Sequence, residues 1–172
     1  EDFEEIYING HAATLNASTG NVATTDDPNN PTQYDGYIDI HKHLGADNQT
    51  VDTDLKSRVA DTSIWGNNHR LRGVSYLYIR FDYDSTVFPN GVPEITALIK
   101  GKKIYDNRTA STAWDDNPSN IIRDYLKNSY GLFEDADNID QDLIDTNADT
   151  CDENVSGVSR YTCNGSFLVD TP

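Results

Sequence analysis

The sequence predicts an α+β, β-dominated fold: a mostly antiparallel sheet centred on residues 74–83, with two helices toward the C-terminus. Residues 72–106 contain the longest strand-like segment, then a Pro/Gly turn, a second strand and a tight basic turn, which is the pattern of a sheet centre. Helical spacing of apolar residues is clearest after Asn117. Strands therefore dominate the first part of the chain and helices follow.

Length and charge limit the classes of function. A chain of 172 residues can bury a core without metal or disulfide staples, and one core is the simplest expectation. The net charge of −16, from 29 acidic and 13 basic residues, argues against a nucleic-acid partner, which requires a positive surface. No run approaches the roughly 20 apolar residues of a membrane helix, so we expect no direct membrane insertion by this chain. The absence of Met suggests a piece of a longer protein.

Residues 1–33 are predicted to form an N-terminal hairpin and a mobile loop. Asn9-Gly10, between the apolar segments 6–8 and 12–15, is typical of a two-residue hairpin turn, and we expect this hairpin at a sheet edge. Residues 16–32 offer almost nothing to bury and therefore predict a loop or a mobile excursion.

Residues 34–110 are predicted to form the β-rich core. Residues 34–44 alternate as a half-buried strand does, and a short helix with Asp52 or Thr53 near its cap is expected within residues 50–59. Residues 74–83 are apolar on both faces at one end, which favours a central strand. After the turn at residues 88–93, two further segments, 95–99 and 104–105, complete a predicted three-strand meander.

Residues 111–172 are predicted to form a helical segment plus a closing strand, packed on the same body after a linker at residues 106–116. Asn117-Pro118 is a strong helix start, with Asn117 as the N-cap, and Gly131 is placed to end that helix. A second helix is expected to start between Asn138 and Asp140. The closing strand is expected at residues 160–168. The first helix carries an apolar stripe at helical spacing, formed by Ile121, Ile122, Tyr125 and Leu126.

His41 and His43 are expected to project from the same side of a strand, a geometry that zinc sites use. No third ligand can be identified in the sequence. An exposed polar strand face is therefore favoured over a metal site.

Other candidates for chemistry are no more specific. Residues 134–145 are rich enough in carboxylates to suggest calcium but lack the glycine and closing glutamate of an EF-hand, so an acidic helix start is the simpler interpretation. Cys151 and Cys163 can pair or remain free thiols, and cytosolic assembly favours free thiols. No nucleophile elbow or phosphate-binding glycine loop is present. We therefore expect no enzymatic activity, no cofactor and no metal.

A series of short motifs in fixed order resembles one family. The sequence contains Gly-Lys-Lys-Ile-Tyr-Asp at 101–106, Ala-Trp-Asp-Asp-Asn-Pro at 113–118, Cys-Asp-Glu at 151–153 and Arg-Tyr-Thr-Cys-Asn-Gly at 160–165. This order is similar to that of the tail tip attachment (central hub, host-specificity) proteins of lambda-like siphophages and prophages. The resemblance covers roughly residues 36–165, and Asp106-Asn107-Arg108 departs from the Asp-Pro-Arg of many relatives.

The resemblance implies a structural protein of the virion tail, assembled in the bacterial cytoplasm as a homotrimeric hub that binds other tail tip and tube proteins. It implies no catalytic residues. Aromatic side chains concentrate at interface centres, so the interface candidates are Tyr37, Tyr76, Tyr78 and Trp114, with core packing as the alternative role, at least as favoured for Tyr76 and Tyr78. The alternative function is a secreted calcium- or carbohydrate-binding β module.

Overall fold

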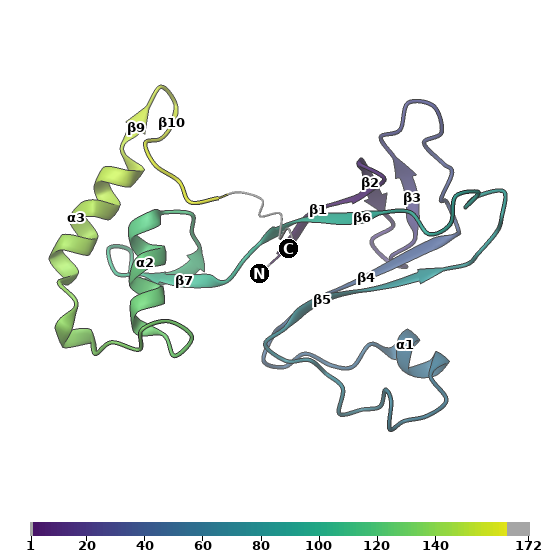
Figure 1. Cartoon of the computed structure of the whole chain (residues 1–172), viewed down its shortest axis with the longest axis horizontal. Coiled ribbons are helices and arrows are strands. Elements are labelled where there is room, and N and C mark those ends of the chain that lie inside the picture. Colours follow the sequence, from purple (N-terminus) through teal and green to yellow (C-terminus); the bar gives the residue numbers. More distant parts are fainter. Residues whose placement is uncertain (1, 165–172) are drawn as a thin grey trace, which may run out of the picture. The chain divides into compact units, whose positions relative to one another are not determined.

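The computed structural model describes residues 2–164 and divides the chain into two compact units, Glu1–Gly101 and Lys102–Pro172 (Figure 1). Antiparallel strands dominate and α-helices are fewer, so the predicted α+β, β-dominated class is confirmed. The boundary between the units follows Gly101, whereas the sequence had suggested a change near residue 110.

The larger sheet of the first unit has the strand order β3-β2-β1-β6, with every neighbouring pair antiparallel. Its strands are β1 (Asp2–Ile8), β2 (His11–Leu15), β3 (Val22–Thr25) and β6 (Ile95–Lys100). The predicted hairpin is confirmed: Asn9 and Gly10 join β1 to β2 with φ of 50° and 80°, the left-handed pair that a type I′ turn requires. Its expected edge position is wrong, because β3 and β6 flank it.

Residues 16–32 are not simply a mobile loop, since they contain β3. Gly20 lies so close to β4 that an added Cβ would approach the carbonyl oxygen of Ile40 to 2.6 Å, and its φ of 75° also favours glycine. The Ile40 amide donates to the Gly20 carbonyl at 2.8 Å. This contact and the fully buried Val22 attach the segment to the core, which the polar composition of the segment concealed.

The second sheet of this unit contains β4 (Ile38–Leu44) and β5 (Ser75–Phe81), paired antiparallel over their full length. Between them the chain forms a long loop that carries α1 (Thr53–Arg58), whose N-cap is Asp52 as expected. The expectation that residues 74–83 form the sheet centre is wrong, because β5 pairs only with β4. The meander is also wrong: β6 pairs with β1, a partner too distant in sequence for local patterns to indicate.

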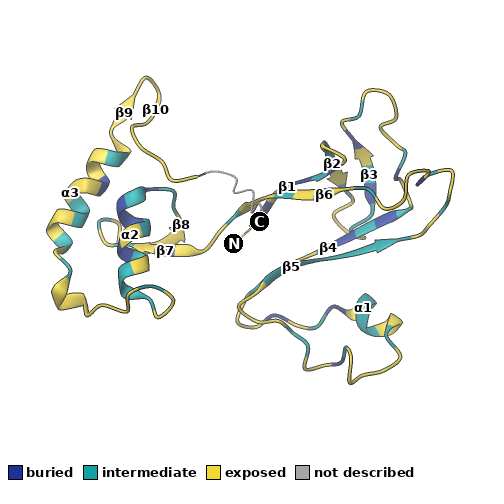
Figure 2. Ribbon diagram, viewed as in Figure 1, coloured by how far each residue is buried: buried dark blue, intermediate teal, exposed yellow. Residues whose placement is uncertain are grey.

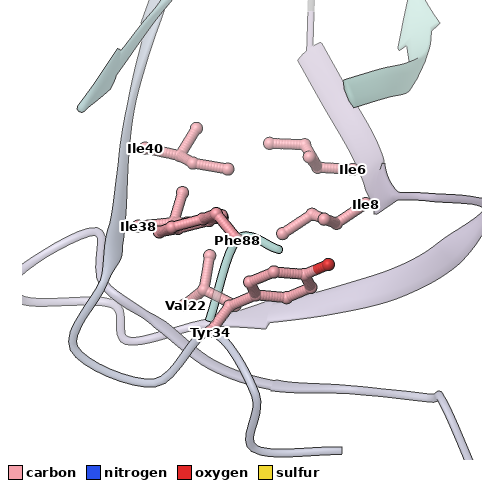
Figure 3. Packing of buried hydrophobic residues seen from close by; sticks show 7 residues of the cluster. All are labelled: Ile6, Ile8, Val22, Tyr34, Ile38, Ile40 and Phe88. Atoms are coloured by element: carbon pink, nitrogen blue, oxygen red, sulfur yellow. The ribbon is translucent and has the colours of Figure 1, made fainter. Parts of the chain in front are cut away.

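The core of the first unit lies between the two sheets. Figure 3 shows Ile38 and Ile40 of β4 facing Ile6 and Ile8 of β1, with Phe88 between them. Phe88 is only 3% exposed and stacks on Tyr34 at a centroid distance of 5.9 Å. The turn expected at residues 88–93 thus also supplies a central core residue.

The second unit contains a two-stranded ribbon, two α-helices, a short 3₁₀ helix (Ala136–Asn138) and a small hairpin. Its other elements are β7 (Lys103–Asp106), β8 (Ser111–Trp114), α2 (Pro118–Lys127), α3 (Gln141–Asp152), β9 (Asn154–Val155) and β10 (Val158–Ser159).

Both predicted helix starts are confirmed, with Asn117 and Asp140 as N-caps. α2 ends at the C-cap Asn128, before Gly131. Residues 106–116 are not only a linker, because they contain β8. Residues 160–164 of the expected closing strand are not extended in a sheet, and residues 165–168 lie outside the described part of the chain.

In the described part of the second unit most of the buried residues are polar, and Figure 2 shows buried segments on α2. Its buried apolar residues are Ile104 and Ala148, whereas Asn117, Ser119, Asn120 and Arg123 are also buried. None of the described helices has the length and apolarity needed to cross a membrane.

Candidate functional site

The most concentrated polar chemistry in the first unit is a cluster around Asp52. The Oδ2 atom of Asp52 lies 2.8 Å from His41 Nδ1 and 2.8 Å from His43 Nε2, while Oδ1 accepts a hydrogen bond from the Leu55 amide. The Asp52 side chain is 3% exposed. One carboxylate thus caps α1 and attaches the helix to two side chains of β4.

Aromatic rings of β5 pack on these histidines because the strand register places them opposite each other. His43 stacks on Tyr76 at 4.4 Å, and His41 meets the Tyr78 ring edge-on at 5.3 Å. The Tyr78 hydroxyl donates to Asp54 Oδ2 at 3.0 Å. The expected exposed polar strand face is therefore wrong: both imidazoles are half-buried between α1 and β5.

Burial and hydrogen bonding act on the ionisable groups of this cluster. Burial alone raises the pKa of the Asp52 carboxyl, but hydrogen bonds from the Leu55 amide, His43 and His41 outweigh it, and that pKa is lowered. Burial raises the pKa of Tyr76, with the nearby Asp52 charge adding to the effect. Burial and the bond to Asp54 raise the pKa of Tyr78.

The cluster has the character of a structural clamp. The Asp52 oxygens are used by the two imidazoles and the helix cap, and among residues 2–164 no hydroxyl or thiol nucleophile is bonded to either histidine. Between residues 2 and 164, no group of three or more His, Cys, Asp or Glu side chains is arranged to hold a metal ion, and this includes residues 134–145. Cys151 and Cys163 are free thiols.

The four interface candidates lie in different surroundings. Tyr37 packs edge-on against Phe88 at 6.4 Å, so it contributes to the core, and Tyr76 and Tyr78 pack on the histidines. Trp114 lies on β8, all four residues of which are exposed. The three tyrosines thus take part in packing within the first unit, and Trp114 is exposed within the second.

In the second unit, the motifs of the ordered series contact one another. Arg108 joins two of them: Nη2 donates to Asp106 Oδ2 at 2.9 Å and to Asp152 Oδ2 at 2.7 Å, while Nη1 donates to Asp149 at 2.9 Å. Lys102 donates to both carboxylate oxygens of Asp124 on α2. The turn at 101–106 is thereby bound to both helices.

The remaining motifs are joined through residues 115–120. The Asn117 side chain donates to the Ala148 carbonyl of α3 at 2.9 Å. The Asp116 carbonyl accepts the Cys163 amide at 2.7 Å, and the Tyr161 amide donates to the Cys151 carbonyl. Motifs far apart in sequence therefore form one hydrogen-bonded framework. Sequence order had grouped them without indicating these contacts.

Helix α2 has its polar side inward and part of its apolar stripe outward. Ser119, Asn120 and Arg123 are buried against the rest of the unit, and Arg123 lies over the Tyr105 ring. Ile122 and Tyr125 are 55% and 50% exposed. An exposed apolar face of this kind marks a contact surface more often than a catalytic one.

Neither a scan against protein-family models nor a search of the curated proteins finds a match to this chain.

Proposed function

We propose that this chain is a structural component of a bacteriophage or prophage tail tip hub, which contributes to tail assembly and host attachment without catalysing a reaction. The observation that carries the proposal is the framework in the second unit. The four motifs that resemble the hub family contact one another there: Arg108 links Asp106 to Asp152, residues 103–104 pair with residues 113–114, and the backbone of Cys163 and Tyr161 binds that of Asp116 and Cys151. Residues that bind one another in this way maintain the shape of the unit.

The polar groups of the chain also support an architectural role. Asp106 is engaged in an ion pair with Arg108, and Asp52 both caps α1 and holds the histidines of β4. The exposed apolar residues of α2 and β8 supply surface for neighbouring proteins. In this proposal the full-length protein is a homotrimer that contacts other tail tip and tube proteins.

Negative-stain imaging of the purified full-length protein tests the proposal. We expect a threefold ring, and antibodies against this chain should label the tip of the virion tail. A full-length protein that stays monomeric at high concentration, and virions without label, would contradict the proposal. Neighbouring tape-measure and tail-assembly genes would add independent support.

The alternative of a calcium- or carbohydrate-binding module has a separate test. Ligand binding to the folded state raises the melting temperature. A clear increase with calcium or with a glycan panel would favour the binding module over the hub.

A further inference from the structure

Five exposed apolar residues lie on α2 and on the turn that follows it. We call this group the α2 patch, and its members are Ile122, Tyr125, Tyr130, Leu132 and Phe133. The Tyr125 and Tyr130 rings are 6.5 Å apart, and the Leu132 amide donates to the Tyr125 carbonyl. Phe133, which follows, is 75% exposed. Exposed apolar residues gathered on one helix and its following turn mark a contact surface more often than apolar residues scattered singly do.

The α2 patch cannot turn inward without breaking buried hydrogen bonds. On the opposite side of the helix, Asn117 donates to Ala148 at 2.9 Å and the Ser119 hydroxyl donates to the Ile144 carbonyl at 2.9 Å. Arg123 donates to Gln141. A rotation of α2 would leave these polar groups buried and unpaired, which is strongly unfavourable. The framework thus keeps the patch at the surface.

In the turn after α2, Phe133 exposes its ring although its backbone conformation is unfavourable. Phe133 has a φ of 52°, in the left-handed region that Asn or Gly adopts more readily than a bulky residue. The Glu134 amide, which donates to Leu126 at 2.8 Å, holds this backbone in place. A phenylalanine that is both strained and exposed adds nothing evident to folding. A contact between its ring and a partner protein would account for it.

The chain that follows the α2 patch is acidic. Lys102 lies over the Tyr130 ring, but its charge is paired with Asp124. Between Lys127 and Arg160 the sequence has nine acidic residues and no basic one, and this run begins at Glu134, directly after Phe133. A partner must therefore be apolar at its centre and basic at its rim.

We propose that the α2 patch docks an amphipathic helix of a neighbouring tail protein, one that presents apolar residues flanked by Lys and Arg. The occupant is a helix because Ile122 and Tyr125, one turn apart, form a ridge of the type that packs into the groove of another helix. A second copy of the chain is the poorer occupant, since two acidic rims would face each other in a protein of charge −16. This inference rests on the proposed function and specifies its partner.

The test uses two synthetic amphipathic peptides with the same leucine face, one with Lys and Arg on its polar face and the other with Glu. Fluorescence anisotropy should show that the chain binds the basic peptide, more weakly as salt increases, and does not bind the acidic peptide. Phe133→Asn should lower the affinity about tenfold, as loss of an interface anchor does. Asn also suits a φ of 52°, so this variant should fold at least as well as the wild type.

The matched control is Leu98→Ser, which removes an apolar side chain 49% exposed on β6 and should leave the affinity for the basic peptide unchanged. Equal binding of the basic peptide by Phe133→Asn and the wild type would overturn the inference, because general attraction to an acidic protein would then explain it. Sedimentation of a dimer that Phe133→Asn abolishes would overturn it in favour of a second copy.

The two proposals fail in different ways. Peptide binding that depends on Phe133, in a full-length protein that forms no ring, would overturn the hub and retain the docking surface. A threefold ring of the full-length protein, without selective binding of the basic peptide, would retain the hub and overturn the docking surface.

Discussion

The carboxylate of Asp106 shows how single residues maintain the framework. Burial alone raises its pKa, but hydrogen bonds from the Arg108 side chain and amide outweigh this effect, so the pKa lies below its ordinary value. Asp106 and Arg108 side chains are 15% and 18% exposed. Their interaction is therefore only partly screened by solvent.

We predict a pH-dependent contribution from Asp106. Because its pKa is lowered by folding, the carboxylate stabilises the folded state fully above the unfolded pKa of about 3.9, and this stabilisation is lost as the pH falls through the folded value. Asp106→Asn should cost about 1 kcal/mol of unfolding free energy at pH 5–7, after allowance for solvent screening. Below about pH 4 the difference from wild type should shrink.

Urea denaturation of both proteins across this pH range is the measurement. Asp47→Asn, which alters an exposed carboxylate, is the control and should change stability by less than about 0.5 kcal/mol at pH 7. A difference between Asp106→Asn and wild type that stays constant down to pH 3 would show that the charge of Asp106 is not what the framework uses.

At the scale of elements, α1 depends on its cap. The helix has six residues, none of them buried, so it is too short to be stable alone. Asp52 supplies both the cap and the connection to β4. The position of α1 therefore depends strongly on Asp52, whereas Gln49 joins the two ends of the loop by hydrogen bonds to Gly45, Arg70 and Leu71.

Asp52→Ala should release α1 from β4. The substitution removes the cap and two hydrogen bonds to histidine, a loss of about 2 kcal/mol. Hydrogen exchange of the amides of residues 53–59 should accelerate, while those of β1 and β6 remain protected, because their ladder does not involve Asp52. Asp47→Ala in the same loop is the matched control. Unchanged exchange at residues 53–59 in Asp52→Ala would show that the loop is held by other contacts.

Sequence patterns correctly predicted the elements that are determined by adjacent residues. Asn9-Gly10 predicted the β1–β2 turn, and Asn117-Pro118 predicted the start of α2, because turn and cap chemistry depends on adjacent residues. The pairing of β1 with β6 could not be predicted in this way, since it joins Ile8 to Ile95.

The candidate sites follow the same distinction. Alternation placed His41 and His43 on one side of a strand, but their partner Asp52 was identified only as a helix cap. The apolar stripe of α2 was visible in the sequence, whereas its outward position depends on hydrogen bonds from the opposite side of the helix to α3. Tertiary contacts, rather than local patterns, determine both features.

The whole molecule combines two units with different interiors. The first unit buries eight apolar side chains, including Ile6, Ile38 and Phe88. In the described part of the second unit the buried apolar residues are Ile104 and Ala148, accompanied by four polar ones. Apolar burial provides most of the stability of a fold, so the second unit is the weaker of the two and gains more from a partner.

We therefore predict two unfolding transitions in urea, with the second unit unfolding first. Each unit contains one tryptophan, Trp65 in the first and Trp114 in the second, so fluorescence can follow the units separately. With Trp65→Phe the remaining signal reports the second unit, and with Trp114→Phe it reports the first. The Trp114 signal should change at the lower urea concentration.

The variant Arg108→Lys shows which unfolding transition belongs to which unit. Lysine cannot reproduce the fork that binds Asp106, Asp149 and Asp152, so the first transition should lose about 1–2 kcal/mol while the second stays in place. Arg160→Lys, at an exposed pair with Glu153, should move neither by more than about 0.5 kcal/mol. If both tryptophan variants instead unfold at the same urea concentration, and Arg108→Lys shifts both transitions together, the two units unfold as one cooperative body. A partner at the α2 patch would then stabilise the entire chain.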